Sequence, residues 1–337
     1  MKKTFLIFVI VLLAVGAGVL YLWRKGFLSV IPGSEKQKMY VIGVVRTPPT
    51  LDAIWDSFRS KMKDLGYEEG KNVTYKVTEV GGDAAETKKK VALLIDQHLD
   101  LIYPLGGLAV HAAKDVTDER HLNLPIVFGI TADPVKGGLV RDLKNSGNNV
   151  TGVVSANEIV SSKRLELFLE AAPGIKRVVF PWNDPVTTGI DTFRQTVHTL
   201  GLTLAEKHVM SVDELDAFLA TFPFAGGDAL FRASDTIGAT RVEQMSQLAL
   251  RKHVPFSGTS AFDVEKGALM SYGANFKKMG EQGAVLVDKV LSGGKAPTEL
   301  PVELPAEFDL VVNVTTARVL GINLSPEFLA KATRILR

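Results

Sequence analysis

Short polar loops follow the apolar segments of this chain, and their residue types suit the binding of a small molecule. They offer hydroxyl, amide and carboxylate side chains, an indole, and two glycines whose backbone N–H groups could hold an anion at the start of a helix. The candidate ligand-binding residues in these loops are Arg46, Thr47, Gly106, Gly107, Thr131, Asp133, Trp182, Asn183, Ser234, Asp235 and Thr259. Any one of these loops could instead cap the helix after it, because Ser, Asp and Asn are common capping residues.

Motifs for catalysis, metals and cofactors are missing from the sequence. There is no cysteine, which excludes disulfides, thiolate catalysis, cysteine-ligated metals and a lipid anchor on cysteine. None of the six histidines has a second histidine three or four residues away. No phosphate-binding loop, dinucleotide-binding glycine turn or nucleophile elbow is present. We therefore expect no metal, no cofactor and no enzyme activity; an enzyme would need a reactive constellation that the sequence does not show.

The composition is that of a folded protein with a nearly balanced charge. Of 337 residues, 46% are apolar and 23% charged, enough for two ordinary domains or one large one. The 39 Lys and Arg residues against 37 Asp and Glu leave a net charge of +2. Nucleic-acid binding needs a concentrated excess of positive charge, so we expect no nucleic-acid partner.

The N-terminus indicates export. Residues 5–23 form an uninterrupted apolar run, closed by Arg24 and Lys25. As a helix it spans about 28 Å, close to the hydrocarbon thickness of a bilayer. We expect an uncleaved signal anchor, with the folded part on the periplasmic or extracellular side of the cytoplasmic membrane. A cleaved signal, cut within the small residues of 14–18, and a buried helix are the alternatives.

Behind these loops, apolar runs alternate with amphipathic segments. Strands are predicted at 39–45, 72–77, 101–103, 125–129, 177–180, 203–210, 229–231 and 254–256, and helices at 51–65, 84–98, 108–116, 163–172, 188–200, 212–221 and 240–251. Ser211 is suited to cap the helix at 212–221. Such alternation is typical of doubly wound α/β units with parallel sheets. The pattern occurs in both halves of the chain, which predicts two lobes with ligand-binding loops at the carboxyl ends of their strands.

Several motifs resemble one known family. They are Gly-Tyr-Glu-Glu-Gly-Lys-Asn-Val at 66–73, Pro-Ile-Val-Phe at 125–128, Asp-Pro-Val at 133–135, Gly-Asn-Asn-Val-Thr-Gly at 147–152 and Lys-Gly-Ala-Leu at 266–269. The chain from residue 39 onward is similar to the ABC transporter substrate-binding family. More narrowly, it resembles the branch that includes tryptophan- and tyrosine-binding proteins, with the type I periplasmic binding protein fold.

The resemblance implies an architecture and a role. Two Rossmann-like lobes joined by crossover strands would close on an aromatic amino acid or related small aromatic compound and deliver it to an ABC permease with its ATPase. The expected division is a signal anchor and transmembrane helix at 1–26, a linker at 27–38, lobe 1 at 39–154 with about 272–300, and lobe 2 at 155–271 with about 301–337.

The resemblance also bears on the candidate residues. Thr131 and Asp133 match the family pattern, and Trp182 stands where the family often has Tyr, so it is expected to form an aromatic wall. The family usually has Thr or Ser after Gly106, and here Gly107 leaves only backbone donors. Ser234 and Asp235 match the pair of Thr or Ser followed by Asp that the family has in its second lobe.

One position departs from the family in a way that concerns the ligand. Asn275, in Gly-Ala-Asn-Phe at 273–276, stands where the family usually has Asp, so an amide replaces a carboxylate. Asn275 remains a candidate ligand contact. An amino-acid ligand would then need Asp133 or Asp235 to bind its ammonium group.

Two other functions fit the predicted fold. A membrane-tethered sensory module would use the same pocket and signal to a partner protein. A cytoplasmic sugar-type repressor shares the two lobes but needs an N-terminal helix-turn-helix, and the apolar run at 5–23 occupies that place.

Overall fold

The structure is a computed structural model that describes residues 38–47, 49, 51–183 and 189–337. The predicted signal anchor and nearly all of the predicted linker lie outside these residues. Within the described ranges, no helix is both long and apolar enough to cross a membrane. Tyr40–Arg337 forms one compact unit.

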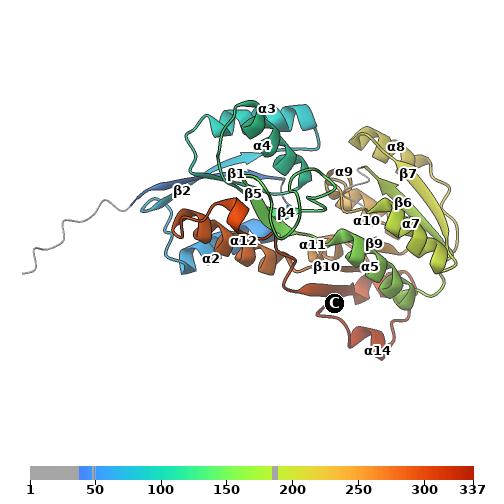
Figure 1. Ribbon diagram of the computed structural model, residues 1–337. Helices are drawn as coiled ribbons and strands as arrows, with labels where there is room; N and C mark the ends of the chain where they lie inside the picture. The colour runs from blue at the N-terminus through green and yellow to red at the C-terminus, as the bar shows by residue number, and fades with distance from the viewer. Residues whose placement is uncertain (1–37, 48, 50, 184–188) are drawn as a thin grey trace, which may run out of the picture. The chain divides into compact units, whose positions relative to one another are not determined.

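A five-stranded sheet forms the first half of this unit (Figure 1). Its strands are all parallel and lie in the order β2-β1-β3-β4-β5. Their bounds are β1 Tyr40–Arg46, β2 Val73–Glu79, β3 Leu101–Pro104, β4 Ile126–Thr131 and β5 Val150–Val154. All of β3 and β5 is buried, as expected of short apolar strands covered on both faces.

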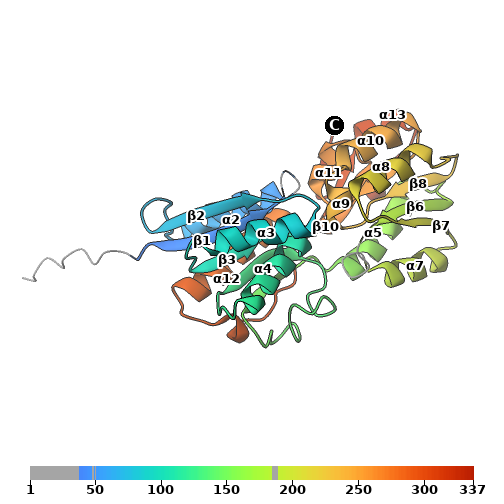
Figure 2. The same ribbon diagram turned by 90° about the horizontal axis from the view of Figure 1, so that it is seen from above.

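Helices cover both faces of the first sheet (Figures 1 and 2). They are α2 (Asp52–Asp64) with α12 (Phe276–Leu291), and α3 (Ala84–Ile95) with α4 (Gly107–Glu119). Phe58 of α2 stacks on Tyr103 of β3 with ring centroids 4.0 Å apart. Gly280 lets α12 approach α2 closely, because a Cβ there would overlap the carbonyl oxygen of Ile54.

The second sheet has seven strands in the order β12-β11-β10-β9-β8-β6-β7. Their bounds are β6 Arg177–Trp182, β7 Thr203–His208, β8 Asp228–Phe231, β9 Phe256–Gly258, β10 Met270–Ala274, β11 Phe308–Asn313 and β12 Arg334–Leu336. All neighbours pair in parallel except β10 with β11, which are antiparallel. This sheet therefore contains strands from both before and after α12.

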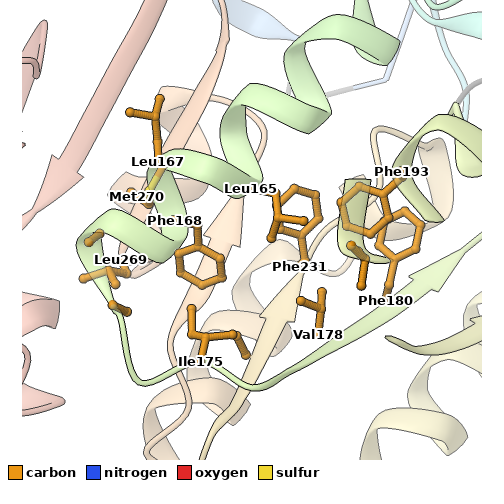
Figure 3. Packing of buried hydrophobic residues seen from close by; sticks show 14 of the residues in the cluster. Leu165, Leu167, Phe168, Ile175, Val178, Phe180, Phe193, Phe231, Leu269 and Met270 are labelled. Carbon is orange, nitrogen blue, oxygen red and sulfur yellow. The ribbon is translucent and has the colours of Figure 1, made fainter. Parts of the chain in front are cut away.

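Helices also cover both faces of the second sheet. The helices α5 (Asn157–Ala171) and α7 (Ile190–Thr199) pack on one face, and α8 (Val212–Thr221) and α10 (Val242–Arg251) on the other. Figure 3 shows the first of these cores, where Phe180, Phe193 and Phe231 lie together. The ring centroids of Phe193 and Phe231 are 4.7 Å apart.

The chain passes between the two sheets three times: from β5 to α5, from β10 to α12, and from the 3₁₀ helix η1 (Pro297–Glu299) to β11. Glu303, on the third passage, forms a bridge with Val153 of β5. The predicted lobe limits remain a proposal. The strand β10 extends the second sheet to Ala274.

Most expected elements are confirmed, and the differences are mainly elements that the sequence analysis did not predict. Ser211 caps α8 by accepting the N–H of Glu214 at 3.2 Å, as predicted. The helix expected at 240–251 is confirmed as α10, and the short helix α9 (Thr236–Ala239), which was not predicted, precedes it. The helix α12 and the strand β11 were not predicted. The short elements α11 (Ala261–Glu265), α13 (Val314–Val319), α14 (Pro326–Leu329) and β12 were not predicted either, because they span too few residues for a hydrophobic period to show.

Candidate ligand-binding site

A pocket of about 150 Å³ lies where the carboxyl ends of strands from both sheets meet. In parallel sheets this edge carries free loop groups, so it is where ligands usually bind. The lining residues are Thr47, Leu51, Gly106, Gly107, Leu108, His111, Ile130, Thr131, Ala132, Ser155, Val160, Arg164, Asn183, Arg232, Ser234, Asp235, Thr236, Ala239, Thr259, Gly273, Ala274 and Phe276.

The structure brings eight of the twelve candidate residues to this pocket. They are Thr47, Gly106, Gly107, Thr131, Asn183, Ser234, Asp235 and Thr259. They lie at the ends of six parallel strands, which are β1, β3 and β4 of the first sheet and β6, β8 and β9 of the second. Arg46, Asp133, Trp182 and Asn275 lie outside the lining.

Arg46 and Asp133 are occupied by local contacts. Arg46 pairs with Asp52 at 2.9 Å and with Glu79 at 2.7 Å, so its charge is used between β1, α2 and β2. The carboxylate of Asp133 accepts the backbone N–H groups of Val135 and Lys136 at 3.1 and 3.0 Å. Asp133 therefore shapes its own turn.

The side chains of Trp182 and Asn275 also make local contacts outside the pocket. The Trp182 ring packs on His208, with centroids 4.4 Å apart, and donates its indole N–H to Glu206 at 3.1 Å. Asn275 caps α12 by accepting the N–H of Lys278 at 2.9 Å. The expected aromatic wall from Trp182 is absent from the pocket lining, and Phe276 is the aromatic ring found there.

Part of the pocket lining is apolar. Leu51 precedes α2, Leu108 lies on α4, Ile130 on β4 and Phe276 on α12, and Val160 comes from α5. Such a surface can hold the hydrocarbon or aromatic body of a ligand by excluding water from it.

The polar part of the lining is built on two buried ionic groups. Arg232 donates through Nε to the carboxylate of Asp263 at 2.9 Å, and both side chains are almost completely buried. The same carboxylate accepts the N–H of Thr259 at 2.6 Å, and Arg232 also donates to the Thr259 hydroxyl. Arg232 and Asp263 thus fix the loops after β8 and β9, and the negative charge of Asp263 compensates the positive charge of Arg232.

Arg164 is a pocket residue that the sequence reasoning missed. It is 1% exposed, donates through Nη2 to the carbonyl of Arg232 at 3.0 Å, and lies over the Phe231 ring with its Cζ 4.4 Å from the centroid. Its buried Nε has no hydrogen-bond partner, and none of the described carboxylates forms an ion pair with it. Burial, helped by the charge of Arg232, lowers the pKa of Arg164 to about 9, so the guanidinium is still charged at neutral pH.

A signal for Arg164 was present in the sequence. Val160, Arg164 and Phe168 are spaced four residues apart, which places the arginine on the buried stripe of α5. An arginine on an apolar stripe must find a partner or remain uncompensated. Ser155, at the end of β5, was also missed; its buried hydroxyl has no hydrogen-bond partner in the part of the chain that the structure describes.

The family model for ABC transporter substrate binding proteins matches residues 38–336. The chain belongs to this family. The resemblance seen in the motifs is thereby confirmed, and so is the expectation of a protein that binds a solute without transforming it.

Relatives of this substrate-binding protein carry the same fold. A tyrosine-binding protein of Clostridioides difficile is 24% identical over 292 residues, covering 86% of this chain and 82% of the relative. An ABC domain from Streptococcus pneumoniae, solved in complex with L-Trp, is 23% identical with a TM-score of 0.81, covering 89% of this chain and 100% of that one.

A conserved domain protein from Vibrio cholerae is 27% identical with a TM-score of 0.77, again over 89% of this chain and 100% of the other. These likenesses confirm the two-lobed α/β fold of periplasmic binding proteins with parallel sheets.

Metal-binding clusters are absent from the described part of this substrate-binding protein. Three of its histidines, His98, His121 and His253, stand in the left-handed backbone region just after α3, α4 and α10. These three histidines follow different helices and are far apart in the sequence.

A second hollow, of about 430 Å³, lies at the opposite edge of the first sheet. Asn123, Asn148 and Asn149 line it together with residues 294–298. None of the buried unpaired polar atoms found in the described ranges belongs to its lining. The pocket at the carboxyl edges therefore remains the candidate site of this substrate-binding protein.

Proposed function

We propose that this protein captures an aromatic amino acid or a related small aromatic compound and delivers it to an ABC permease with its ATPase. The observation that carries the proposal is the composition of the pocket, whose lining combines apolar residues such as Phe276 with the charged residues Arg164 and Asp235. A solute with an aromatic body and a charged end matches this combination.

The relatives support this choice of ligand class. One is named a tyrosine-binding protein, and another was solved with L-Trp. Family membership supports the link to a permease and an ATPase, because substrate-binding proteins work with these components.

The ammonium group of an amino acid needs a carboxylate partner. Among the residues that the structure describes, Asp235 is the acidic side chain that lines the pocket, and Asp133 lies outside the lining. The Asp235 oxygens already accept backbone N–H groups of Asn183 and Gly238. Carboxylate oxygens can accept further bonds, so an ammonium group can still be held there.

We also propose that residues 5–23 anchor the protein in the cytoplasmic membrane, with the pocket on the outer side. The support is the length of the apolar run and the basic residues around it. Tethering raises the concentration of the binding unit near a permease. Membrane fractionation, followed by protease treatment of intact spheroplasts, tests this: an anchored protein sediments with membranes and is digested from outside.

The ligand is tested with the full chain, purified in mild detergent, by thermal-shift and calorimetric titration against amino acids, aromatic acids and amines, nucleosides and sugars. A ligand at a hundred times its Kd stabilises the folded state by about 2.7 kcal/mol, which raises Tm measurably. We expect the largest shifts from aromatic amino acids or aromatic acids. Shifts produced only by sugars or nucleosides would contradict the proposed ligand class.

A further inference from the structure

We propose that Arg164 binds an acidic group of the ligand, so that the captured solute is a carboxylic acid or a similar small anion. This inference rests on the proposed function in one respect, that the pocket at the carboxyl edges is the ligand site. It goes further because it assigns a residue to the charged end of the ligand and names the group that this residue recognises.

The position of Arg164 is the first argument. Its side chain lines the pocket while being 1% exposed. One hydrogen bond, from Nη2 to the Arg232 carbonyl, and the contact with the Phe231 ring hold the guanidinium in place. Its Nε is buried without a partner. A guanidinium fixed in this way keeps donors free for the two oxygens of a carboxylate.

The charges around Arg164 are the second argument. Arg164 and Arg232 are two buried cations near one buried carboxylate, Asp263. Asp263 pairs with Arg232, and no described carboxylate lies within ion-pair distance of Arg164. A buried charge without a partner is strongly unfavourable. An anionic ligand would supply the missing negative charge.

A second unpaired group lines the same pocket. The Ser155 hydroxyl is buried and has no partner among the described residues, although its backbone N–H donates to Thr131 at 2.8 Å. A hydroxyl can donate to an anion. Two orphaned polar side chains in one lining are unusual, because buried polar groups are nearly always hydrogen-bonded. Both unpaired groups are explained if a polar group of the ligand forms hydrogen bonds with them.

The test compares tryptophan with analogues that differ at one end. Indole-3-propionate keeps the carboxylate and lacks the ammonium group, tryptamine keeps the ammonium group and lacks the carboxylate, and L-tryptophanamide carries an uncharged amide in place of the carboxylate. Calorimetric titration of the full chain with each compound gives four affinities. We expect indole-3-propionate to bind and tryptamine and the amide to bind at least about 10-fold more weakly.

The variant Arg164→Gln separates a ligand contact from a structural role. We expect it to lower the affinity for the carboxylate compounds by about 10- to 100-fold while leaving the affinity for tryptophanamide nearly unchanged. Arg334→Gln is the matched control, because Arg334 pairs with Glu265 on the exposed surface and lies outside the pocket. It should change neither affinity.

The Tm of Arg164→Gln without ligand gives an independent reading. Burial disfavours the Arg164 charge, so removing it should leave the Tm of the free protein unchanged or raised. An equal loss of affinity for acid and amide, or no loss for either, would overturn the role of Arg164. If the wild type binds a non-aromatic carboxylate and no aromatic compound, the aromatic ligand class fails and the role of Arg164 stands. Binding of uncharged or cationic solutes alone would overturn the Arg164 proposal.

Discussion

The carboxylate of Asp235 accepts the backbone N–H of Asn183 at 2.9 Å and that of Gly238 at 2.7 Å. One side chain therefore joins the loop after β6 to the loop after β8 and caps α9. Asn183 is held a second time, because its side-chain amide donates to the carbonyl of Val209 at 2.9 Å. The polar part of the pocket lining depends on this connection between neighbouring loops.

Replacing Asp235 should therefore affect both stability and binding. Asp235→Ala removes both accepted hydrogen bonds, and we expect it to lower the free energy of unfolding by about 1–3 kcal/mol. Ligand affinity should fall at least about 10-fold as the two loops separate. Urea denaturation and calorimetry measure the two effects. Asp191→Ala, at an exposed carboxylate, is the control and should change neither. Normal binding by Asp235→Ala would show that the loop connection is not needed.

Trp182 is expected to behave in the opposite way. It packs on His208 and bonds to Glu206 outside the pocket, so Trp182→Ala removes packing from the second sheet. We expect the free energy of unfolding to fall by about 1–3 kcal/mol while ligand affinity changes by less than about twofold. Thermal melting and titration of one sample provide both numbers. A more than tenfold loss of ligand affinity would show that Trp182 contributes to the ligand site.

The sequence predicted the layers well because the signals were local. The buried parallel strands are continuous apolar runs, and helices such as α2 show apolar residues three and four apart. The antiparallel pairing of β10 with β11 could not be predicted, since the two strands are separated by all of α12. The partners of a strand depend on contacts far apart in sequence, which a local pattern does not record.

The residues of the candidate site were predicted in part, and the incorrect predictions share a cause. Strand ends located the loops of Thr131, Ser234 and Thr259, because the carboxyl edge of a parallel sheet follows from topology. Which way a side chain turns within a loop depends on its nearest partners. Asp133 is directed to its own turn in this way, whereas Arg164 was overlooked because it belongs to a helix.

Gly280 is predicted to be required for the contact between α12 and α2. An added Cβ would overlap the Ser57 hydroxyl and the Ile54 carbonyl, and neither neighbour is free to move far within a packed helix. We expect Gly280→Ala to lower the free energy of unfolding by about 1–3 kcal/mol despite the better helix propensity of alanine. Gly226→Ala, where the Cβ meets nothing within 4 Å, is the matched control. Equal stability of the two variants would contradict the close packing.

Acid sensitivity should depend on Asp228. Burial alone would raise the pKa of Asp228, but hydrogen bonds from Arg177 and from the N–H of Ala225 outweigh it and hold the pKa below its usual value. Arg177 binds the carboxylate through Nε at 2.7 Å and through Nη2 at 2.8 Å. Because the folded-state pKa is lowered, this stabilisation is fully present above the ordinary carboxyl pKa and is lost as the pH falls through the lowered folded-state pKa.

We therefore expect Asp228→Asn to lower the free energy of unfolding at pH 7 by about 1–3 kcal/mol and to flatten its decline below about pH 5. Denaturation by urea at several pH values measures both changes. Asp96→Asn removes an exposed ion pair with Arg120 and should have little effect at any pH. Parallel pH curves for wild type and Asp228→Asn would contradict the prediction.

The late return of α12 to the first sheet has a consequence for folding during synthesis. The strands of that sheet are complete by Val154, but α12 begins only at Phe276. Until then the ribosome-bound chain exposes the apolar side of α2, including Ile54 and Phe58, which α12 later covers. The first half of the chain therefore cannot reach its native state before most of the second half has emerged, and its partly folded form keeps apolar surface exposed during that time.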